Sequence, residues 1–241
     1  MTSAGALLVL ADPFDVQAAT FVEANAEADV LRVTPRDLSR EGWKIRSGDP
    51  NSLIAVCGSR RIRRDEIRGV LPRLSHVDES QVPHIAVEDR AYVASEMTAF
   101  MLAFLSALER GVHNRPTSQS LCGPLWSPEH WRRLADALGI AVRFQPRLAS
   151  LDLAIDKANP LDDAPRTVVT LVGDAVFGDA RLGPAVAALA RAARAEMLRA
   201  EFAGEGDDAL FVHASPLVNL ADRDIAMATL DLFRFRTSGA A

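Results

Sequence analysis

The N-terminal segment holds the pattern that most restricts the fold. Residues 6–11 read ALLVLA, a continuous apolar run that Asp12 and Pro13 close. Such a run is typical of a strand buried on both faces, as in a parallel sheet. The next segment, 15–28, has helical spacing and good helix formers, and DVLRVTP at 29–35 predicts a second strand. Strand, helix and strand in this order predict a β-α-β unit of Rossmann type and an α/β fold.

Two short extended segments and a basic run follow this unit. GWKIRS at 42–47 and SLIAVCGSR at 52–60 predict an antiparallel ribbon that turns at 48–50. The basic run SRRIRRDEIRGVLPR occupies 59–73. We interpret this run as a solvated loop or helix edge, and the functional alternative is an anion site lined by arginine, whose planar fork of donors suits oxyanions.

Helices and strands alternate through the rest of the chain. The helix at 88–110 is apolar nearly all round, so we expect it to be buried against a sheet. Ser127 predicts the N-cap of another helix, which Pro128 opens. Helices are expected at 88–110, 127–139, 183–200 and 222–235, and strands at 112–116, 140–144, 201–202 and 209–216. A hairpin is expected at 166–179, with its turn at Gly173 and Asp174.

Composition excludes some functions. The formal net charge is −5 and the isoelectric point is near 5.6, which argues against a general affinity for nucleic acid or anionic membranes. Cys57 and Cys122 are far apart and fit no metal or redox spacing, so we expect buried thiols in a reducing compartment. The start of the chain does not read as a signal sequence. We therefore expect a cytoplasmic protein.

A family resemblance emerges from several segments taken together. DRAYVASEMTAFMLAFLSAL, GVHNRP and WRRLADALGIAV resemble the N-terminal, pre-ATP-grasp domain of RimK-like ATP-grasp ligases, above all the peptide-modifying ligases that form microviridin-type crosslinks. TVVTLVGDAVFGD, the helix after it, EF and LFVHASP resemble the C-terminal part of the same fold. The resemblance implies a Rossmann-like α/β domain packed on a C-terminal half of an ATP-grasp domain, the latter an antiparallel sheet with helices.

The resemblance also implies a magnesium site that this sequence departs from. Members of the family use ATP and magnesium to turn a carboxylate into an acyl phosphate. By position, the family's first acidic ligand falls on Glu201, and its Glu-x-Asn pair falls on His213 and Ser215. Magnesium prefers charged oxygen ligands, so the site should be weakened. His213 then has a structural role, binds zinc together with Glu201, or contacts a small polar or anionic ligand.

Three further residues are candidates for binding. Arg166 precedes the strand that resembles the nucleotide-facing ribbon of the family, where it could hold a phosphate or a carboxylate. His113 and Asn114 lie where family members place substrate-side or interdomain contacts. The alternative for these two residues is a buried pair with satisfied hydrogen bonds.

The lid subdomain of the family is largely missing from the sequence. Only about twenty residues separate the segments that resemble the two halves, with Lys157 as their one lysine. We therefore expect a pre-ATP-grasp-like domain at 1–144, a linker replacing the lid at 145–165, and an ATP-grasp-like half domain at 166–241. Without the lid, the phosphate-binding lysines of the family have no counterparts.

These departures favour a degenerate homologue that acts as a non-catalytic binding or scaffold subunit. Such a subunit would form a homodimer or a complex with an active carboxylate–amine ligase or peptide-modifying enzyme, since loss of the lid would expose apolar surface. No cofactor is expected in that case, and ATP and Mg²⁺ are implied only if the ligase activity survives. The alternatives are a minimal ATP-grasp-type ligase or transferase forming an amide or ester bond, and a small-ligand binding protein.

Overall fold

The computed structural model describes residues 5–46, 48–108, 111–143 and 165–235. Its N-terminal half contains a parallel sheet of order β2-β1-β6, made of β1 (Ala6–Leu10), β2 (Val30–Val33) and β6 (Ile67–Pro72). Helix α1 (Val16–Ala24) connects β1 to β2, and the carboxylate of Asp15 caps it by accepting from the backbone N–H of Ala18. All five residues of β1 are buried, so the predicted β-α-β unit is confirmed.

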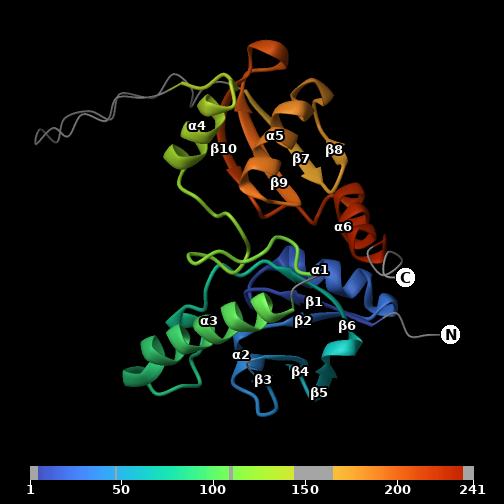
Figure 1. Ribbon diagram of the computed structural model, residues 1–241, viewed down its shortest axis with the longest axis vertical. Helices are drawn as coiled ribbons and strands as arrows, with labels where there is room; N and C mark the ends of the chain where they lie inside the picture. Colours follow the sequence, from blue (N-terminus) through green and yellow to red (C-terminus); the bar gives the residue numbers. More distant parts are fainter. Residues whose placement is uncertain (1–4, 47, 109–110, 144–164, 236–241) are drawn as a thin grey trace, which may run out of the picture.

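A separate antiparallel ribbon lies at the lower end of the molecule in Figure 1. It contains β3 (Lys44–Arg46), β4 (Asp49–Cys57) and β5 (Arg60–Arg63), after the short helix α2 (Pro35–Leu38). The prediction of a loop or helix edge for 59–73 was wrong, because this run forms β5 and β6, an edge strand of the parallel sheet. Ile62 is buried between exposed arginines in a period of two, and that alternation is the strand signal.

Helix α3 (Arg90–Ala107) packs over the N-terminal half with Met101, Phe104 and Leu105 buried. Its predicted burial is only partial, since Tyr92 on the other side is 69% exposed. The strand expected at 112–116 is reduced to one parallel bridge between Val70 and Val112. The chain leaves the sheet there because the next two side chains bond to the C-terminal half instead.

The C-terminal half is an antiparallel sheet of order β10-β9-β7-β8. Its strands are β7 (Arg166–Val172), β8 (Ala175–Phe177), β9 (Met197–Ala203) and β10 (Leu210–Ser215). Helices α4 (Pro128–Ala137) and α5 (Gly183–Ala193) pack on one face in a core that includes Trp131, Leu189 and Phe202. The predicted hairpin and the N-cap at Ser127, which accepts from the N–H of His130, are confirmed.

Two predicted boundaries in this half were wrong. The helix expected at 183–200 ends at Ala193, because Arg194 turns left-handed with a φ of 55° and the chain re-enters the sheet at Met197. Leu198 and Ala200 are buried in the sheet, so tertiary packing overrides their helix propensity. The strand expected at 140–144 is one bridge between Val142 and Phe211, and residue 144 lies outside the described residues.

The two halves share a third hydrophobic core. Leu7 and Val9 of β1 meet Val172 of β7 and Met197 of β9, and α6 (Arg223–Phe235) adds Phe233. The C-terminal helix therefore packs on the N-terminal sheet, as Figure 1 shows. The mixed α/β architecture is confirmed. The boundaries 1–144 and 166–241 remain predictions, and the linker at 145–165 falls almost wholly outside the described residues.

No helix in the described part of the chain is long and apolar enough to cross a membrane.

Gly69 of β6 makes room for the contact between α6 and the N-terminal sheet. A Cβ at this position would lie 2.4 Å from Cδ1 of Phe233 and 2.9 Å from the backbone oxygen of Gly111. We expect Gly69→Ala to lower the free energy of unfolding by about 1–3 kcal/mol through overpacking, measured by urea denaturation. Phe233→Leu in the same chain should recover only part of the loss, because the backbone contact remains. A wild-type midpoint for Gly69→Ala would show that the core relaxes freely.

Candidate functional site

One face of the C-terminal sheet is not covered by α4 and α5, and it carries the predicted site residues. In the register, His213 of β10 lies opposite Glu201 of β9, and Glu201 lies opposite Val168 of β7. Residues directly opposite each other in a sheet point to the same side. We call this surface the open face. It comprises Arg166, Val168, Arg199, Glu201, His213 and Ser215.

A shift of register in β10 gives the open face its histidine. Phe211 pairs with Phe202 and is buried in the core under α4, whereas His213 pairs with Glu201 on the opposite face. Residues two apart on a regular strand would share one face. Because of the shift between them, Phe211 and His213 point to opposite faces, Phe211 into the core and His213 onto the open face.

Glu201 is engaged by a neighbouring arginine. The guanidinium Nη1 of Arg199 lies 2.6 Å from Oε1 of Glu201, and the two side chains are 32% and 28% exposed. One oxygen of the carboxylate is thus occupied by the guanidinium, whose positive charge offsets part of the negative charge. Glu201 therefore offers less negative charge to a metal ion than its sequence position implies.

The imidazole of His213 favours its neutral form. Burial lowers its pKa, the charges of Arg199 and Arg132 lower it further, and only the charge of Glu201 raises it. Arg132 reaches this strand from α4, where its Nε donates to the backbone oxygen of Val212 at 3.2 Å. The Nδ1 atom of His213 is buried and has no hydrogen-bond partner among the residues that the structure describes.

These groups do not fit a magnesium site. His213 and Ser215 replace the acidic and amide ligands that the resemblance implies, and Glu201 is bound to Arg199. Within the described ranges no cluster of three or more His, Cys, Asp and Glu side chains could hold a metal ion. Zinc takes at least three protein ligands, so the predicted pair of Glu201 and His213 would need another.

Arg166 and Ser215 lie at different levels of the open face. Arg166 pairs with Ala203 at one end of β7, whereas Ser215 pairs with Arg199, four residues further along β9. At about 3.3 Å per residue their levels are roughly 13 Å apart. The hydroxyl of Ser215 accepts from the backbone N–H of Leu217 at 3.2 Å, so it stabilises the turn after β10.

His113 and Asn114 make contacts between the two halves. The Oδ1 atom of Asn114 accepts from the N–H groups of Glu196 and Met197 at 2.7 and 2.9 Å. Its Nδ2 donates to the backbone oxygens of Met197 at 2.8 Å and Pro216 at 3.4 Å. His113, fully buried, bonds through Nδ1 to the carboxylate of Glu196. Both side chains therefore contact the C-terminal half, and the amide of Asn114 is buried with its hydrogen-bonding groups satisfied.

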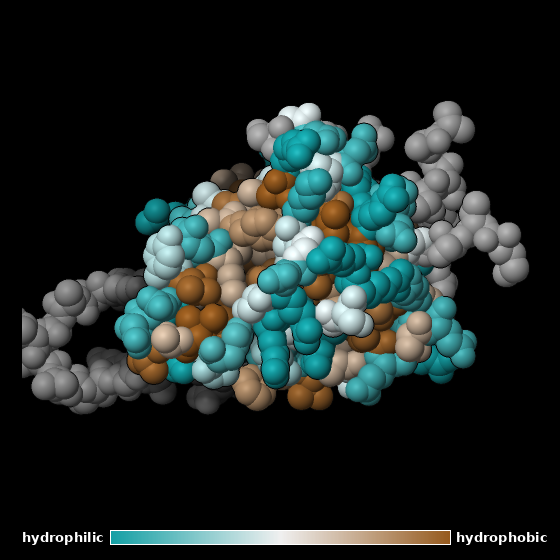
Figure 2. Space-filling view, turned by 90° about the horizontal axis from the view of Figure 1, so that it is seen from below, coloured by the Kyte–Doolittle hydropathy of each residue, from teal (hydrophilic) through white to brown (hydrophobic). Residues whose placement is uncertain are grey.

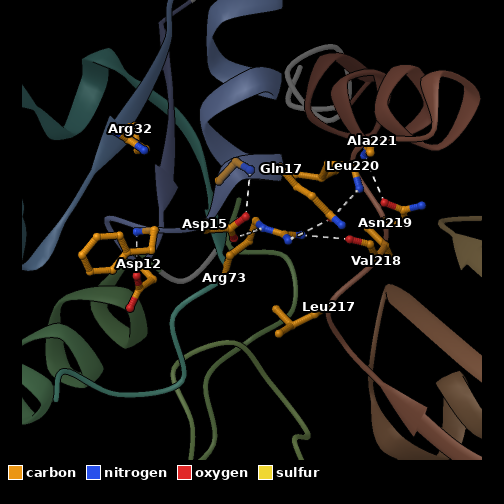
Figure 3. Close-up of polar contacts among 12 residues, drawn as sticks. Asp12, Asp15, Gln17, Arg32, Arg73, Leu217, Val218, Asn219, Leu220 and Ala221 are labelled. Carbon is orange, nitrogen blue, oxygen red and sulfur yellow. Dashed lines mark hydrogen bonds and ion pairs between the residues drawn. The ribbon is translucent and has the colours of Figure 1, made fainter. Parts of the chain in front are cut away.

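A second set of polar contacts joins the two halves, and it was not predicted from the sequence. Nε of Arg73 donates to Oδ2 of Asp15 at 2.8 Å, and its Nη1 donates to the backbone oxygen of Val218 at 2.9 Å (Figure 3). The side-chain oxygen of Gln17 accepts from the N–H of Leu220 at 3.2 Å. The carboxyl ends of β1 and β6 thereby hold the segment that follows β10. Arg73 lies in the basic run, but no signal in the sequence indicates its partners.

Comparison with known proteins gives a likeness in structure only. No protein-family model matches the sequence, and no curated protein is detectably similar to it. The macrocyclase MdnC from Microcystis aeruginosa MRC, bound with precursor peptide MdnA, aligns with a TM-score of 0.70 and 12% identity over 95% of this chain and 99% of MdnC.

Two further ligases align over similar lengths. PsnB, in complex with a phosphomimetic variant of its minimal precursor, Mg and ADP, gives a TM-score of 0.67 and 12% identity over 97% of this chain and 99% of PsnB. A peptide-modifying ATP-grasp ligase from Chryseobacterium gregarium, with ADP and a leader and core peptide, gives 0.57 and 12% over 96% of this chain and 97% of the ligase. The chain therefore has the ATP-grasp ligase fold.

Asn114 should be a major contributor to stability. We expect Asn114→Ala to lower the free energy of unfolding by about 2–4 kcal/mol, because four hydrogen bonds are lost and buried backbone groups are left unsatisfied. Urea denaturation measures the effect. Asn51→Ala removes an exposed asparagine of β4 and should stay within about 0.5 kcal/mol of wild type. Equal midpoints for both variants would contradict the assigned role of Asn114.

The charges around His213 should be visible in its titration. We expect Arg199→Gln to raise the pKa of His213, because it removes a cation and frees the carboxylate of Glu201. Glu201→Gln should lower that pKa, because the remaining charges from Arg199 and Arg132 both oppose protonation. An NMR titration of the imidazole resonances measures both shifts, with Arg191→Gln on α5 as the control. Shifts of the same sign in the two variants would contradict the geometry.

Proposed function

We propose that this protein is a non-catalytic binding subunit with an ATP-grasp ligase fold, which binds a peptide and works beside an active peptide-modifying ligase. The observation that carries the proposal is the state of the open face. Glu201, the carboxylate at the expected metal position, is ion-paired to Arg199, and the opposite position on β10 holds His213.

The charge at this position opposes magnesium. A divalent cation that bridges phosphates needs hard, negatively charged oxygen ligands in a partly dry site. Here the charges of Arg199 and Arg132 act on His213 against the charge of Glu201, so a cation at the same place would gain less from that carboxylate. The phosphates of a nucleotide would then lack the metal that offsets their charge during transfer.

The peptide part of the proposal rests on the fold and on the surface. The structures of MdnC and PsnB contain precursor peptides, which makes a polypeptide the first ligand to test here. The open face joins an apolar residue, Val168 at 38% exposed, to the Arg199–Glu201 pair, so it offers apolar and polar contacts to an extended chain. The partner that we propose is an active peptide-modifying ligase, and a homodimer is the alternative assembly.

A minimal ligase is the second candidate function. It is favoured by the survival of Glu201 together with two arginines near His213, since arginine can hold phosphate without a metal. In that case the protein would form an amide or ester bond with ATP as the source of energy. A small-ligand binding protein would use the same face without turnover.

A thermal melt with nucleotide separates these functions. We expect no rise of the melting temperature in millimolar ATP with Mg²⁺. A ligand at 100 times its dissociation constant adds about 2.7 kcal/mol, which would raise the melting temperature by about 5–10 °C for a chain of this size. Light scattering in the same samples reports whether the protein is a monomer or an assembly. A rise of several degrees, or release of ADP in the presence of a precursor peptide, would overturn the non-catalytic proposal.

A double variant provides the control for the metal argument. His213→Glu with Ser215→Asn restores the family pattern and adds a carboxylate opposite Glu201. We expect Mg²⁺ alone to raise the melting temperature of this variant and to leave that of the wild type unchanged. The same response in both proteins would mean that Mg²⁺ binds elsewhere.

A further inference from the structure

Charge is strongly segregated along this chain. Residues 32–68 contain ten of the 27 basic residues and only five of the 32 acidic residues. This segment therefore carries a formal charge of +5, whereas the rest of the chain carries −10. The ribbon β3-β4-β5 lies within it, at the opposite end of the N-terminal half from the C-terminal sheet (Figure 1).

The register of the ribbon gathers basic side chains on one face. Ile54 of β4 pairs with Lys44 on one side and with Arg63 on the other, so these three residues share a face. Val56 pairs with Arg61 on this face, while Ala55 and Ile62 point into the core. Val56 is itself buried, so we call the surface of Lys44, Ile54, Arg61 and Arg63 the basic ribbon face.

The cations of the basic ribbon face are only weakly compensated. Arg63 lies 3.4 Å from the carboxylate of Asp65, but both side chains are 73% exposed, so this pair contributes little. In the described part of the chain neither Lys44 nor Arg61 has a side-chain hydrogen bond or ion pair. Figure 2, seen from below, shows hydrophilic surface across the middle of this end of the molecule with apolar patches beside it.

An acidic polypeptide fits this surface better than a nucleic acid. Affinity for nucleic acid rises with the number of phosphates that the protein neutralises, and three cations neutralise few. A long polyanion would also meet the −10 charge of the rest of the chain. A short extended peptide meets only the local field, and its apolar side chains can contact Ile54, which is partly exposed.

We propose that the basic ribbon face is a docking surface for an acidic segment of a partner polypeptide. Lys44, Arg61 and Arg63 contact its carboxylates, with the arginine forks favouring paired oxygens. The surface lies on a different sheet from the open face, so this interaction goes beyond the proposed function and can be tested without it.

The test uses the full chain and an (Asp-Val)₄ peptide amide with fluorescein on its N-terminal amine. The alternation places the aspartate carboxylates on one side of an extended peptide. Fluorescence anisotropy in 100 mM NaCl should show saturable binding. Arg61→Glu with Arg63→Glu should weaken it by about tenfold or more, and Lys44→Glu should weaken it in the same direction. The melting temperature of each variant checks that the exposed substitutions leave the fold intact.

Charge-matched controls decide whether the face itself is responsible. Arg133→Glu with Arg223→Glu makes the same change in net charge on the exposed sides of α4 and α6 and should change the affinity by less than about threefold, since charges beyond a Debye length are screened. An equal loss in this control would overturn the proposal. So would absence of binding, equal binding of the (Asn-Val)₄ peptide, or tighter binding of an eight-nucleotide single-stranded DNA.

Discussion

The buried amide of Asn114 fixes where the two sheets of this protein meet. Its oxygen accepts from the N–H groups of Glu196 and Met197 at the start of β9, and its nitrogen donates to the backbone oxygens of Met197 and of Pro216, which follows β10. The start of β9 and the exit of β10 are thus tied to one side chain of the N-terminal half. Because Glu201 and His213 lie on these two strands, the geometry of the open face depends on a residue that does not belong to it.

Much of the secondary structure could be predicted from local sequence pattern, whereas the contacts that join the two halves could not. The β-α-β unit, the long helix and the hairpin at 166–179 follow from periodicity and turn residues. The helix at 183–200 was overextended because alanine and arginine favour helix, while burial of Leu198 in the sheet decides against it. The bond from Arg73 to Val218 spans 145 residues, and no local signal predicts it.

The candidate site divides in the same way. The family resemblance predicts that Glu201 and His213 lie on two strands of one site. The register places them opposite each other. The sequence does not reveal that Arg199 binds Glu201 or that Arg132 reaches β10 from α4, because both depend on how side chains fold back over the strands. These two arginines decide the charge of the face. In the basic run the composition was evident, but the alternation of Ile62 with arginines, which indicates the strand, was overlooked.

The shift of register in β10 makes the length of this strand adjustable at one point. Phe211 and His213 lie opposite Phe202 and Glu201, which are consecutive residues of β9, so Val212 is an extra residue in the ladder. Loss of Val212 would leave a regular strand in which the imidazole still lies opposite Glu201 and Phe211 still enters the core under α4. Loss of a residue elsewhere in β10 would instead move the side chains that follow to the opposite face. A change of length by one residue at this bulge can therefore occur without altering which side chains reach the open face.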